Sequence, residues 1–328
     1  MLELGGPHAT RLRALVEMVN EELQTHLDAV GDVGHSRAVD LARHVLLAGG
    51  KRLRPVIGIL VYELMGGRDL DRIMPIALAF EFIHTATLVH DDINDNAKLR
   101  RGVPTLHERF TSAEAIVAGD FLFVQGFRLA APLDSTLVDV ISNCCVDMVS
   151  AELAQIDQRG NVDASYVDQH SIIRGKTAGL FASCCQAAGH LAEASAEQKD
   201  VLYSMGEEIG VAFQLVDDLL DLRGDNLTGK GVCMDLFEGK FTLPVLHAID
   251  HLEGEDHAKF LQYIQNFHER HIEETLSLIE HSGGFRRTEE EVMRRLDVAG
   301  SMLVDIAPES ESRDQLILLL SELAVRRS

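Results

Sequence analysis

The sequence predicts an all-α protein, and three observations lead to that prediction. Apolar residues recur with a period near 3.6 through long stretches of the 328-residue chain, as they do along the buried face of a helix. Most of the seven prolines lie near the ends of these stretches, where a helix tolerates proline. No segment alternates apolar and polar residues in the manner of a half-buried strand. Because 46% of the residues are hydrophobic, the chain can bury a large core in one domain or two.

The first predicted elements are two amphipathic helices over residues 9–48, with a break near Gly31–Gly34. Apolar residues on one face of the first helix suit either the core or a contact between subunits; they are Leu12, Leu15, Val16 and Val19.

A basic segment, GGKRLRP at residues 49–55, follows and leads into an apolar helix. Its two glycines free the backbone, and Pro55 suits the first turn of the next helix. Lys51 and Arg54 would direct their charged ends at a common anion, and an arginine fork can chelate phosphate oxygens. The alternative is a basic helix start exposed to water.

Two acidic motifs end the helices predicted over residues 70–98 and 200–223. Each places carboxylates at positions i, i+1 and i+4, so that the first and third share one face of a helix. The stop signals are Gly102 with Pro104, and Gly224. The six residues are Asp91, Asp92 and Asp95 in the first motif, and Asp217, Asp218 and Asp221 in the second.

Both groups lie at the negative end of a helix dipole, so their charges repel unless cations bind. Carboxylate oxygens suit Mg²⁺, which takes one or two carboxylates and leaves its other positions to water or phosphate. A solvated acidic face is the alternative for either motif alone. We favour a metal site because the motif occurs twice, each time followed by basic residues.

The first acidic helix also predicts a pocket with charge at its mouth and hydrocarbon below. Successive rotations of 100° place polar and apolar residues on one stripe: Phe80, His84, Thr87, Asp91 and Asp95, with Ile83 and Ala86 beside it. His84 is either a functional residue or a hydrogen-bonded core residue. Arg100 and Arg101 close the segment, within reach of a phosphate held near the aspartates, or else they are exposed surface arginines.

Two further segments combine glycine with lysine. Arg174–Gly179, RGKTAG, gives a cation and a hydroxyl beside a helix kink, and it lacks the spacing of a P-loop. Lys230 and Lys240 lie on a glycine-containing loop before Thr242–Pro244 restarts a helix. Residues 112–160 are predicted as helices, in which no role is assigned to Glu152, Gln155 and Asp157. Residues 251–328 are predicted as helices that pack behind the core.

Charge and cysteine content exclude several classes of protein. With 30 Lys and Arg against 52 Asp and Glu, the formal charge of −22 argues against nucleic-acid binding. Five cysteines without a CxxC spacing suit a reducing compartment. We find no signal sequence and no apolar run near 18 residues, so we expect a soluble, cytoplasmic protein without an integral membrane segment.

Five motifs together resemble the trans-prenyltransferase family, the all-trans polyprenyl diphosphate synthases. They are GGKRLRP at 49–55, HDDINDNAKLRRG at 90–102, RGKTAGLF at 174–181, FQLVDDLLD at 213–221 and GK…DLFEGKFTLP at 229–244. The resemblance covers about residues 45–250 and implies the isoprenoid synthase fold. That fold is a single domain, here 1–328, forming a helical barrel around a deep central cavity, usually in a homodimer.

The resemblance also implies the roles of individual residues. The six aspartates match the ligands of two or three Mg²⁺ ions that bridge an allylic diphosphate. The residues that match contacts to this diphosphate are Arg100, Lys176, Thr177, Gln214, Lys230 and Lys240. Those that match the isopentenyl diphosphate site are Lys51, Arg54, His84 and Arg101. The sequence departs from the family pattern at Cys233, where a glycine is common, and at Met234, which puts the geometry of that loop in doubt more than the activity.

In this family, a bulky aromatic residue one to two turns before the first aspartates blocks the tunnel and stops chain growth early. Ala86 and Thr87 are small, and Phe80 lies about 16 Å along the helix from Asp91. We therefore expect a long product, of the heptaprenyl-to-decaprenyl class, such as octaprenyl diphosphate. The alternative for Ala86 is a packing role against a neighbouring helix.

Other readings concern related enzymes and one non-catalytic role. A shorter-chain farnesyl or geranylgeranyl diphosphate synthase is the runner-up. A head-to-head synthase or a cyclase has no use for the GGKRLRP site. A non-catalytic partner subunit would be expected to lose one aspartate motif, and both are intact.

Overall fold

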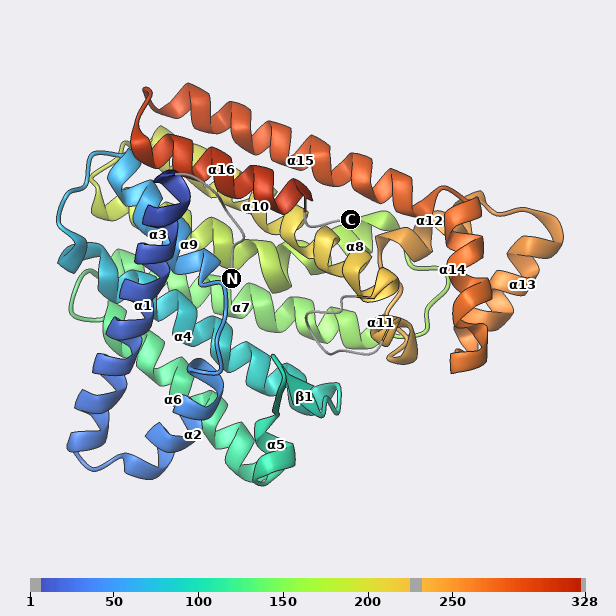
Figure 1. The fold of residues 1–328 in the computed structure, drawn as a ribbon, viewed down its shortest axis with the longest axis horizontal. Helices are drawn as coiled ribbons and strands as arrows, with labels where there is room; N and C mark the ends of the chain where they lie inside the picture. Colours follow the sequence, from blue (N-terminus) through green and yellow to red (C-terminus); the bar gives the residue numbers. More distant parts are fainter. Residues whose placement is uncertain (1–6, 225–231, 326–328) are drawn as a thin grey trace. The chain divides into compact units, whose positions relative to one another are not determined.

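The protein is described by a computed structural model that covers residues 7–224 and 232–325. It is built almost entirely of helices (Figure 1). The chain divides into two compact units. Unit 1 consists of Met1–Asn143, Leu180–Gly206 and Met302–Leu319, and unit 2 of Cys144–Gly179, Glu207–Ser301 and Leu320–Ser328. The all-α prediction is confirmed, whereas one domain over 1–328 stays a prediction.

Unit 1 carries the N-terminal helices and a short hairpin whose two strands have two residues each. Its complete elements are α1 (Pro7–Asp32), α2 (Ser36–Leu46), α3 (Leu53–Leu64), α4 (Leu70–Asn94), β1 (Leu99–Arg100), β2 (Val103–Pro104), α5 (Leu106–Arg109) and α6 (Ser112–Ala130). The division between the units falls inside or at the start of α7 (Ser135–Asp157), α9 (Gly179–Leu191), α10 (Ala196–Arg223), α15 (Gly284–Ile306) and α16 (Glu311–Val325).

Unit 2 carries shorter elements between these helices. They are α8 (Tyr166–Ile173), a π-helical segment (Arg174–Ala178), α11 (Met234–Phe237), α12 (Leu243–His251), α13 (Gly254–Gln265), a 3₁₀ turn (Glu269–His271) and α14 (Ile272–His281). A capping box formed by Ser165 and Asp168 starts α8. The kink predicted at Arg174–Gly179 is this π-helical segment, a feature often found at functional sites.

Helix α4 is the central helix of unit 1 and lies alongside α6 (Figure 1). Two α6 glycines permit the close approach. A Cβ at Gly126 would lie 2.7 Å from Ile83, and one at Gly119 would overlap the His90 ring. By length and composition α4 could cross a membrane, but 72% of its most apolar window is buried inside the protein. A core helix of a soluble protein meets the same criterion.

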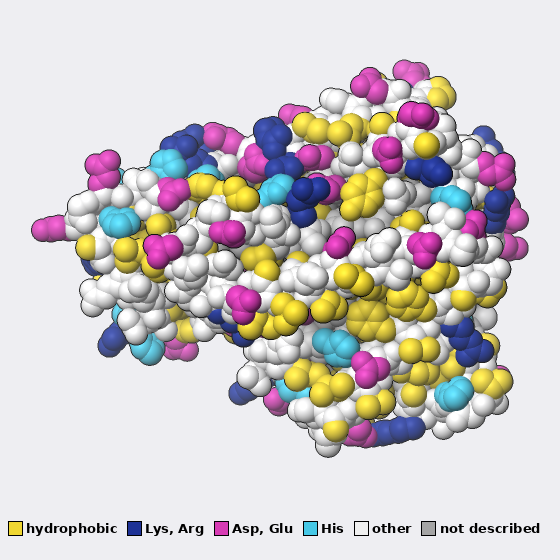
Figure 2. Space-filling model, turned by 180° about the vertical axis from the view of Figure 1, so that it is seen from behind, with side chains coloured by type: hydrophobic (Ala, Val, Ile, Leu, Met, Phe, Trp, Pro, Cys, Tyr) yellow, Lys and Arg dark blue, Asp and Glu magenta, His cyan; other side chains and the backbone are white. Residues whose placement is uncertain are grey.

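The predicted helix ends agree with the structure in most places. The break near Gly31–Gly34 separates α1 from α2, and Leu12, Leu15 and Val19 are buried, which assigns this face to the core. Helix α4 ends at Asn94 rather than at residue 98, and the hairpin that follows was not predicted. Four strand residues are too few to produce an alternating pattern. On the face shown in Figure 2, charged side chains lie among patches of apolar ones.

Candidate active site

The first acidic motif ends α4 in unit 1. Asp91 lies in the last turn, and Asp95 caps the helix by donating its backbone N–H to the Asp91 carbonyl at 2.9 Å. Asp92 is buried, and its Oδ1 accepts hydrogen bonds from Arg100 Nε at 2.8 Å and Nη2 at 2.5 Å. The hairpin places Arg100 there, because Arg101 and Gly102 at its tip adopt φ values of 54° and 78°. A guanidinium therefore offsets part of the charge at this helix end.

The basic loop lies against the same hairpin. Arg101 donates from Nη1 to the Gly49 carbonyl, and its guanidinium covers Gly50, where a Cβ would lie 2.8 Å from Nη1. Gly50 also has a φ of 152°, in the region that favours glycine. Arg54 is buried with its guanidinium 4.2 Å from the centre of the Phe181 ring, and Lys51 is partly exposed.

His84 lies within this cluster of cations. Burial lowers the pKa of His84 well below its usual value, and the charges of Arg54, Arg101, Arg100 and Arg52 lower it further. The imidazole is therefore neutral and can donate one N–H. The four residues predicted for isopentenyl diphosphate belong to this one unit, and their surroundings suit an anion.

The second acidic motif ends α10 in unit 2. Asp218 is 2% exposed, and its Oδ1 accepts a hydrogen bond from Gln214 Nε2 at 2.9 Å. Its Oδ2 is buried without a hydrogen-bond partner among the described residues. Burial raises the pKa of Asp218 well above its usual value, and the charge of Asp235 raises it further. A carboxylate in this position is stabilised by a cation.

Asp221 anchors the segment that follows α10. Its Oδ1 and Oδ2 accept the backbone N–H groups of Met234 and Asp235, each at 3.1 Å. Cys233 starts α11 with φ 61° and ψ 33°, a left-handed conformation that glycine adopts most readily. The departure from the family pattern at Cys233 therefore falls on a strained backbone position.

The π-helical segment supplies a hydroxyl and an amine to unit 2. Thr177 Oγ1 donates to Gln214 Oε1 at 2.7 Å, so that Thr177, Gln214 and Asp218 form one chain of hydrogen bonds. Lys176 Nζ donates to Gln155 Oε1 at 2.8 Å and pairs with Glu152. Sequence reasoning gave Glu152 and Gln155 no role, although their i, i+3 spacing on an otherwise apolar helix was visible.

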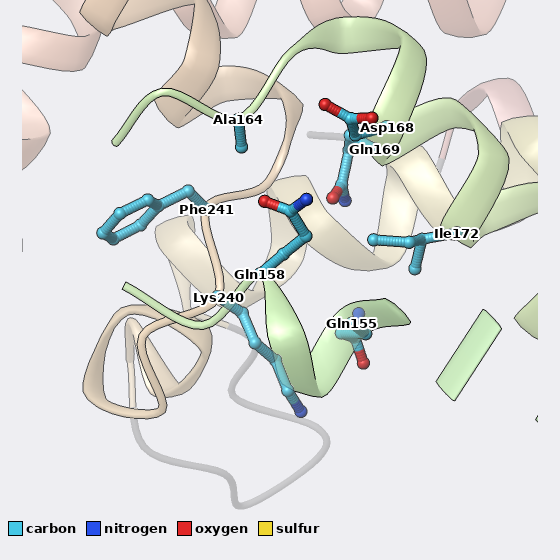
Figure 3. A pocket seen from close by; sticks show the side chains of 8 residues that line it. All are labelled: Gln155, Gln158, Ala164, Asp168, Gln169, Ile172, Lys240 and Phe241. Atoms are coloured by element: carbon cyan, nitrogen blue, oxygen red, sulfur yellow. The ribbon is translucent and has the colours of Figure 1, made fainter. Parts of the chain in front are cut away.

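Lys240 forms an ion pair with Glu238 at 2.6 Å. Lys240 and Gln155 also border a small pocket lined by both polar and apolar side chains. Figure 3 shows the side chains that line it, Gln155, Gln158, Ala164, Asp168, Gln169, Ile172, Lys240 and Phe241. Lys230 lies outside the described residues.

The donor set in each unit suits a hard divalent cation. The groups are carboxylate oxygens at helix ends, and Asp218 offers an oxygen that no described residue satisfies. No three acidic, histidine or cysteine side chains within 7–224 and 232–325 converge as a metal-binding cluster. Mg²⁺ needs no such cluster, because it keeps water or phosphate at most of its positions.

The residues predicted to control product length lie on α4. Phe80, Ile83 and Ala86 are fully buried, and Thr87 is partly exposed and donates its hydroxyl to the His84 carbonyl at 2.8 Å. Ile83 fills the space over Gly126 of α6, so its side chain is a helix contact. The roles of the four residues in product length stay predictions.

Comparison with known proteins gives consistent matches. The family model described as polyprenyl synthetase matches residues 36–280. The all-trans-nonaprenyl-diphosphate synthase (geranyl-diphosphate specific) of Rhodobacter capsulatus is 32% identical over 328 residues, covering 98% of this chain and 96% of that protein. The octaprenyl diphosphate synthase of Escherichia coli K12 is 33% identical over 317 residues, covering 96% and 94%.

A solved structure also matches along nearly the whole chain. It is the polyprenyl synthase of Caulobacter crescentus CB15 complexed with calcium and isoprenyl diphosphate. The TM-score is 0.90 at 30% sequence identity, and the match covers 99% of this chain and 100% of that one.

Proposed function

The chain belongs to the polyprenyl synthetase family, and from this premise we propose that it is a trans-polyprenyl diphosphate synthase that makes a long product. It condenses isopentenyl diphosphate head to tail (1'-4) with an allylic diphosphate and releases pyrophosphate. The observation that carries this proposal is the pair of acidic helix ends accompanied by basic side chains. One has Arg100 bound to Asp92, and the other has Lys176 and Lys240 in the same unit.

The allylic diphosphate is held by basic and polar side chains that match the family's contacts to it. Lys176, Thr177, Gln214, Lys240 and Arg100 bind its oxygens, with Lys230 as a further predicted contact. When bound by the aspartates, two or three Mg²⁺ ions neutralise the charge that develops on the departing pyrophosphate. Lys176 and Lys240 do the same, so that the allylic C–O bond breaks and pyrophosphate leaves with the electron pair.

Isopentenyl diphosphate is held by the cation cluster of unit 1. Lys51, Arg54 and Arg101 bind its diphosphate, and neutral His84 donates an N–H to it. Its double bond then attacks the allylic carbon to form the new C–C bond. A proton leaves the resulting cation for the released pyrophosphate, which restores the double bond. The lengthened allylic diphosphate is the primer for the next round.

Assay of chain extension tests this function directly. The protein is incubated with labelled isopentenyl diphosphate, farnesyl diphosphate and Mg²⁺, and the dephosphorylated products are sized. We expect a ladder that ends between heptaprenyl and decaprenyl. A reaction without Mg²⁺ is the control and should give no product. Absence of any extension would exclude the synthase, and products that stop at farnesyl or geranylgeranyl length would establish the shorter-chain alternative.

Product length depends on the small residues before Asp91. Ala86→Phe places an aromatic ring on α4 and should shorten the products, while Ala86→Ser, which keeps the residue small, should leave them unchanged. An unchanged distribution in Ala86→Phe would assign Ala86 to helix packing alone.

A homodimer is supported by an exposed apolar stripe on α7. Its members have exposed fractions of 41–63% and the spacing i, i+3, i+7, i+10; they are Val146, Val149, Leu153 and Ile156. Such a stripe suits a two-fold contact between identical helices. Glutamate at Val149 and Leu153 should give a monomer by light scattering, whereas Val304→Glu on α15 should not.

A cytoplasmic location is supported by the five cysteines, none of which forms a disulfide.

A further inference from the structure

A buried ion pair in unit 1 joins the basic loop to α4 and has no part in the chemistry above. Arg52 and Glu81 are each 2% exposed, and Arg52 Nη1 lies 2.5 Å from Glu81 Oε1. The other nitrogens of the guanidinium are also engaged. Nε donates to Asn20 Oδ1 at 2.9 Å, and Nη2 donates to the Leu46 carbonyl. One side chain therefore ties the loop to α1, to the end of α2 and to α4.

The backbone of the loop explains why such an anchor is useful. Gly49, Gly50 and Arg52 have φ values of 98°, 152° and 50°. A residue with a side chain rarely adopts the left-handed conformation of Arg52, and such strain persists only where surrounding contacts enforce it. Here the buried contacts of Arg52 enforce it, while Arg101 donates a hydrogen bond to the Gly49 carbonyl and packs its guanidinium against Gly50.

A gain in folding stability does not by itself explain why the protein buries this ion pair. Removing two charges from water costs about as much as their attraction returns, so an apolar pair of similar volume is often equally stable. Directional hydrogen bonds can instead select one conformation of the loop. Lys51 precedes Arg52, and Arg54 follows it in the first turn of α3, so the backbone at Arg52 sets the starting point of both side chains.

We propose that the Arg52–Glu81 pair is a positioning element for the isopentenyl diphosphate subsite. It holds the 49–52 loop in its left-handed conformation and thereby directs Lys51 and Arg54 at the same diphosphate. The inference rests on the proposed function, because that function assigns the diphosphate to these two residues.

The test is Glu81→Gln, which keeps the volume of the side chain and removes its charge. We expect the KM for isopentenyl diphosphate to rise about 10- to 100-fold, because small misplacements of binding groups carry costs of this order. The KM for farnesyl diphosphate should stay within about twofold, since the residues that bind it are not anchored by this pair.

Glu63→Gln is the matched control. Glu63 lies on α3, the helix that the loop begins, and pairs with Arg11 at 2.5 Å without touching the loop. It should lower the melting temperature and leave both KM values unchanged. If Glu81→Gln does not fold, Arg52→Met with Glu81→Leu replaces the pair by apolar side chains and should show the same selective rise in KM.

The outcomes separate the two proposals. A parallel change in both KM values, or no change in either, overturns the positioning role. Calorimetric binding of isopentenyl diphosphate to the wild-type protein and to Glu81→Gln gives a readout that needs no turnover. If the wild-type protein extends no primer, the proposed function fails, and equal binding by the two proteins then overturns the positioning role as well.

Discussion

The two acidic helix ends have the same sequence spacing but different surroundings. In unit 1, Asp92 is buried against Arg100, whose guanidinium donates two hydrogen bonds to one carboxylate oxygen. In unit 2, Asp218 is equally buried, but its Oδ2 has no hydrogen-bond partner among the described residues. The charged groups that act most on Asp218 are themselves acidic: Asp235, Asp217 and Asp221.

This difference shows that the negative charge of the same sequence motif can be balanced in two ways. The first carries a permanent counter-charge from its own polypeptide and is largely formed without a metal ion. In the second, no basic side chain among the described residues pairs with Asp218, so its ionised form costs stability until a cation binds. Binding of Mg²⁺ and diphosphate should therefore stabilise unit 2 more than unit 1.

The largest expected effect is on turnover. Asp92→Asn and Asp218→Asn should each lower kcat by about 10³-fold, since each removes a carboxylate from the proposed metal and diphosphate site. Initial rates with labelled isopentenyl diphosphate at saturating Mg²⁺ measure this. Asp256→Asn, an exposed change on α13, is the control and should keep the full rate. If either motif variant keeps its activity, the two acidic ends do not serve one reaction.

The same variants should have opposite effects on the metal-free protein. Asp218→Asn removes a buried acidic group whose ionised form has no basic partner among the described residues, and it should raise the free energy of unfolding by about 1–3 kcal/mol. Asp92→Asn leaves Arg100 without its carboxylate and should lower that free energy by about 1–3 kcal/mol. Denaturant unfolding in EDTA measures both, with Asp256→Asn again as the control. Changes of the same sign would contradict the contrast drawn between the two ends.

The smallest expected effect is a pH dependence in unit 1. Because burial and nearby arginines depress the pKa of folded His84, the unfolded chain takes up a proton near pH 6.5 that the folded protein does not. Stability should therefore be fully present above pH 6.5 and fall as the pH drops below it. His84→Gln should make this slope shallower between pH 6.5 and 5, whereas His281→Gln, on the exposed end of α14, should not. An unchanged slope in His84→Gln would show that His84 protonates normally in the folded protein.

The sequence by itself determined the helices and the acidic residues at their ends. Periodicity near 3.6 marks the buried face of a helix without reference to its neighbours, so α1, α4 and α10 were predictable. The spacing of Asp91 with Asp95, and of Asp217 with Asp221, likewise follows from helix geometry alone. The GGKRLRP segment predicts an anion site because glycine and cations are adjacent in the chain, whereas RGKTAG alone is a weak signal.

Only the tertiary structure decided which partners these groups have. The pairing of Asp92 with Arg100 depends on a hairpin too short to leave a sequence pattern. The burial of Arg52 against Glu81 depends on segments that are distant in sequence, and so does the Asp218 oxygen that no described residue bonds. Local propensity decides where a helix forms, whereas burial and ion pairing depend on what packs against it, and a single sequence does not specify those contacts.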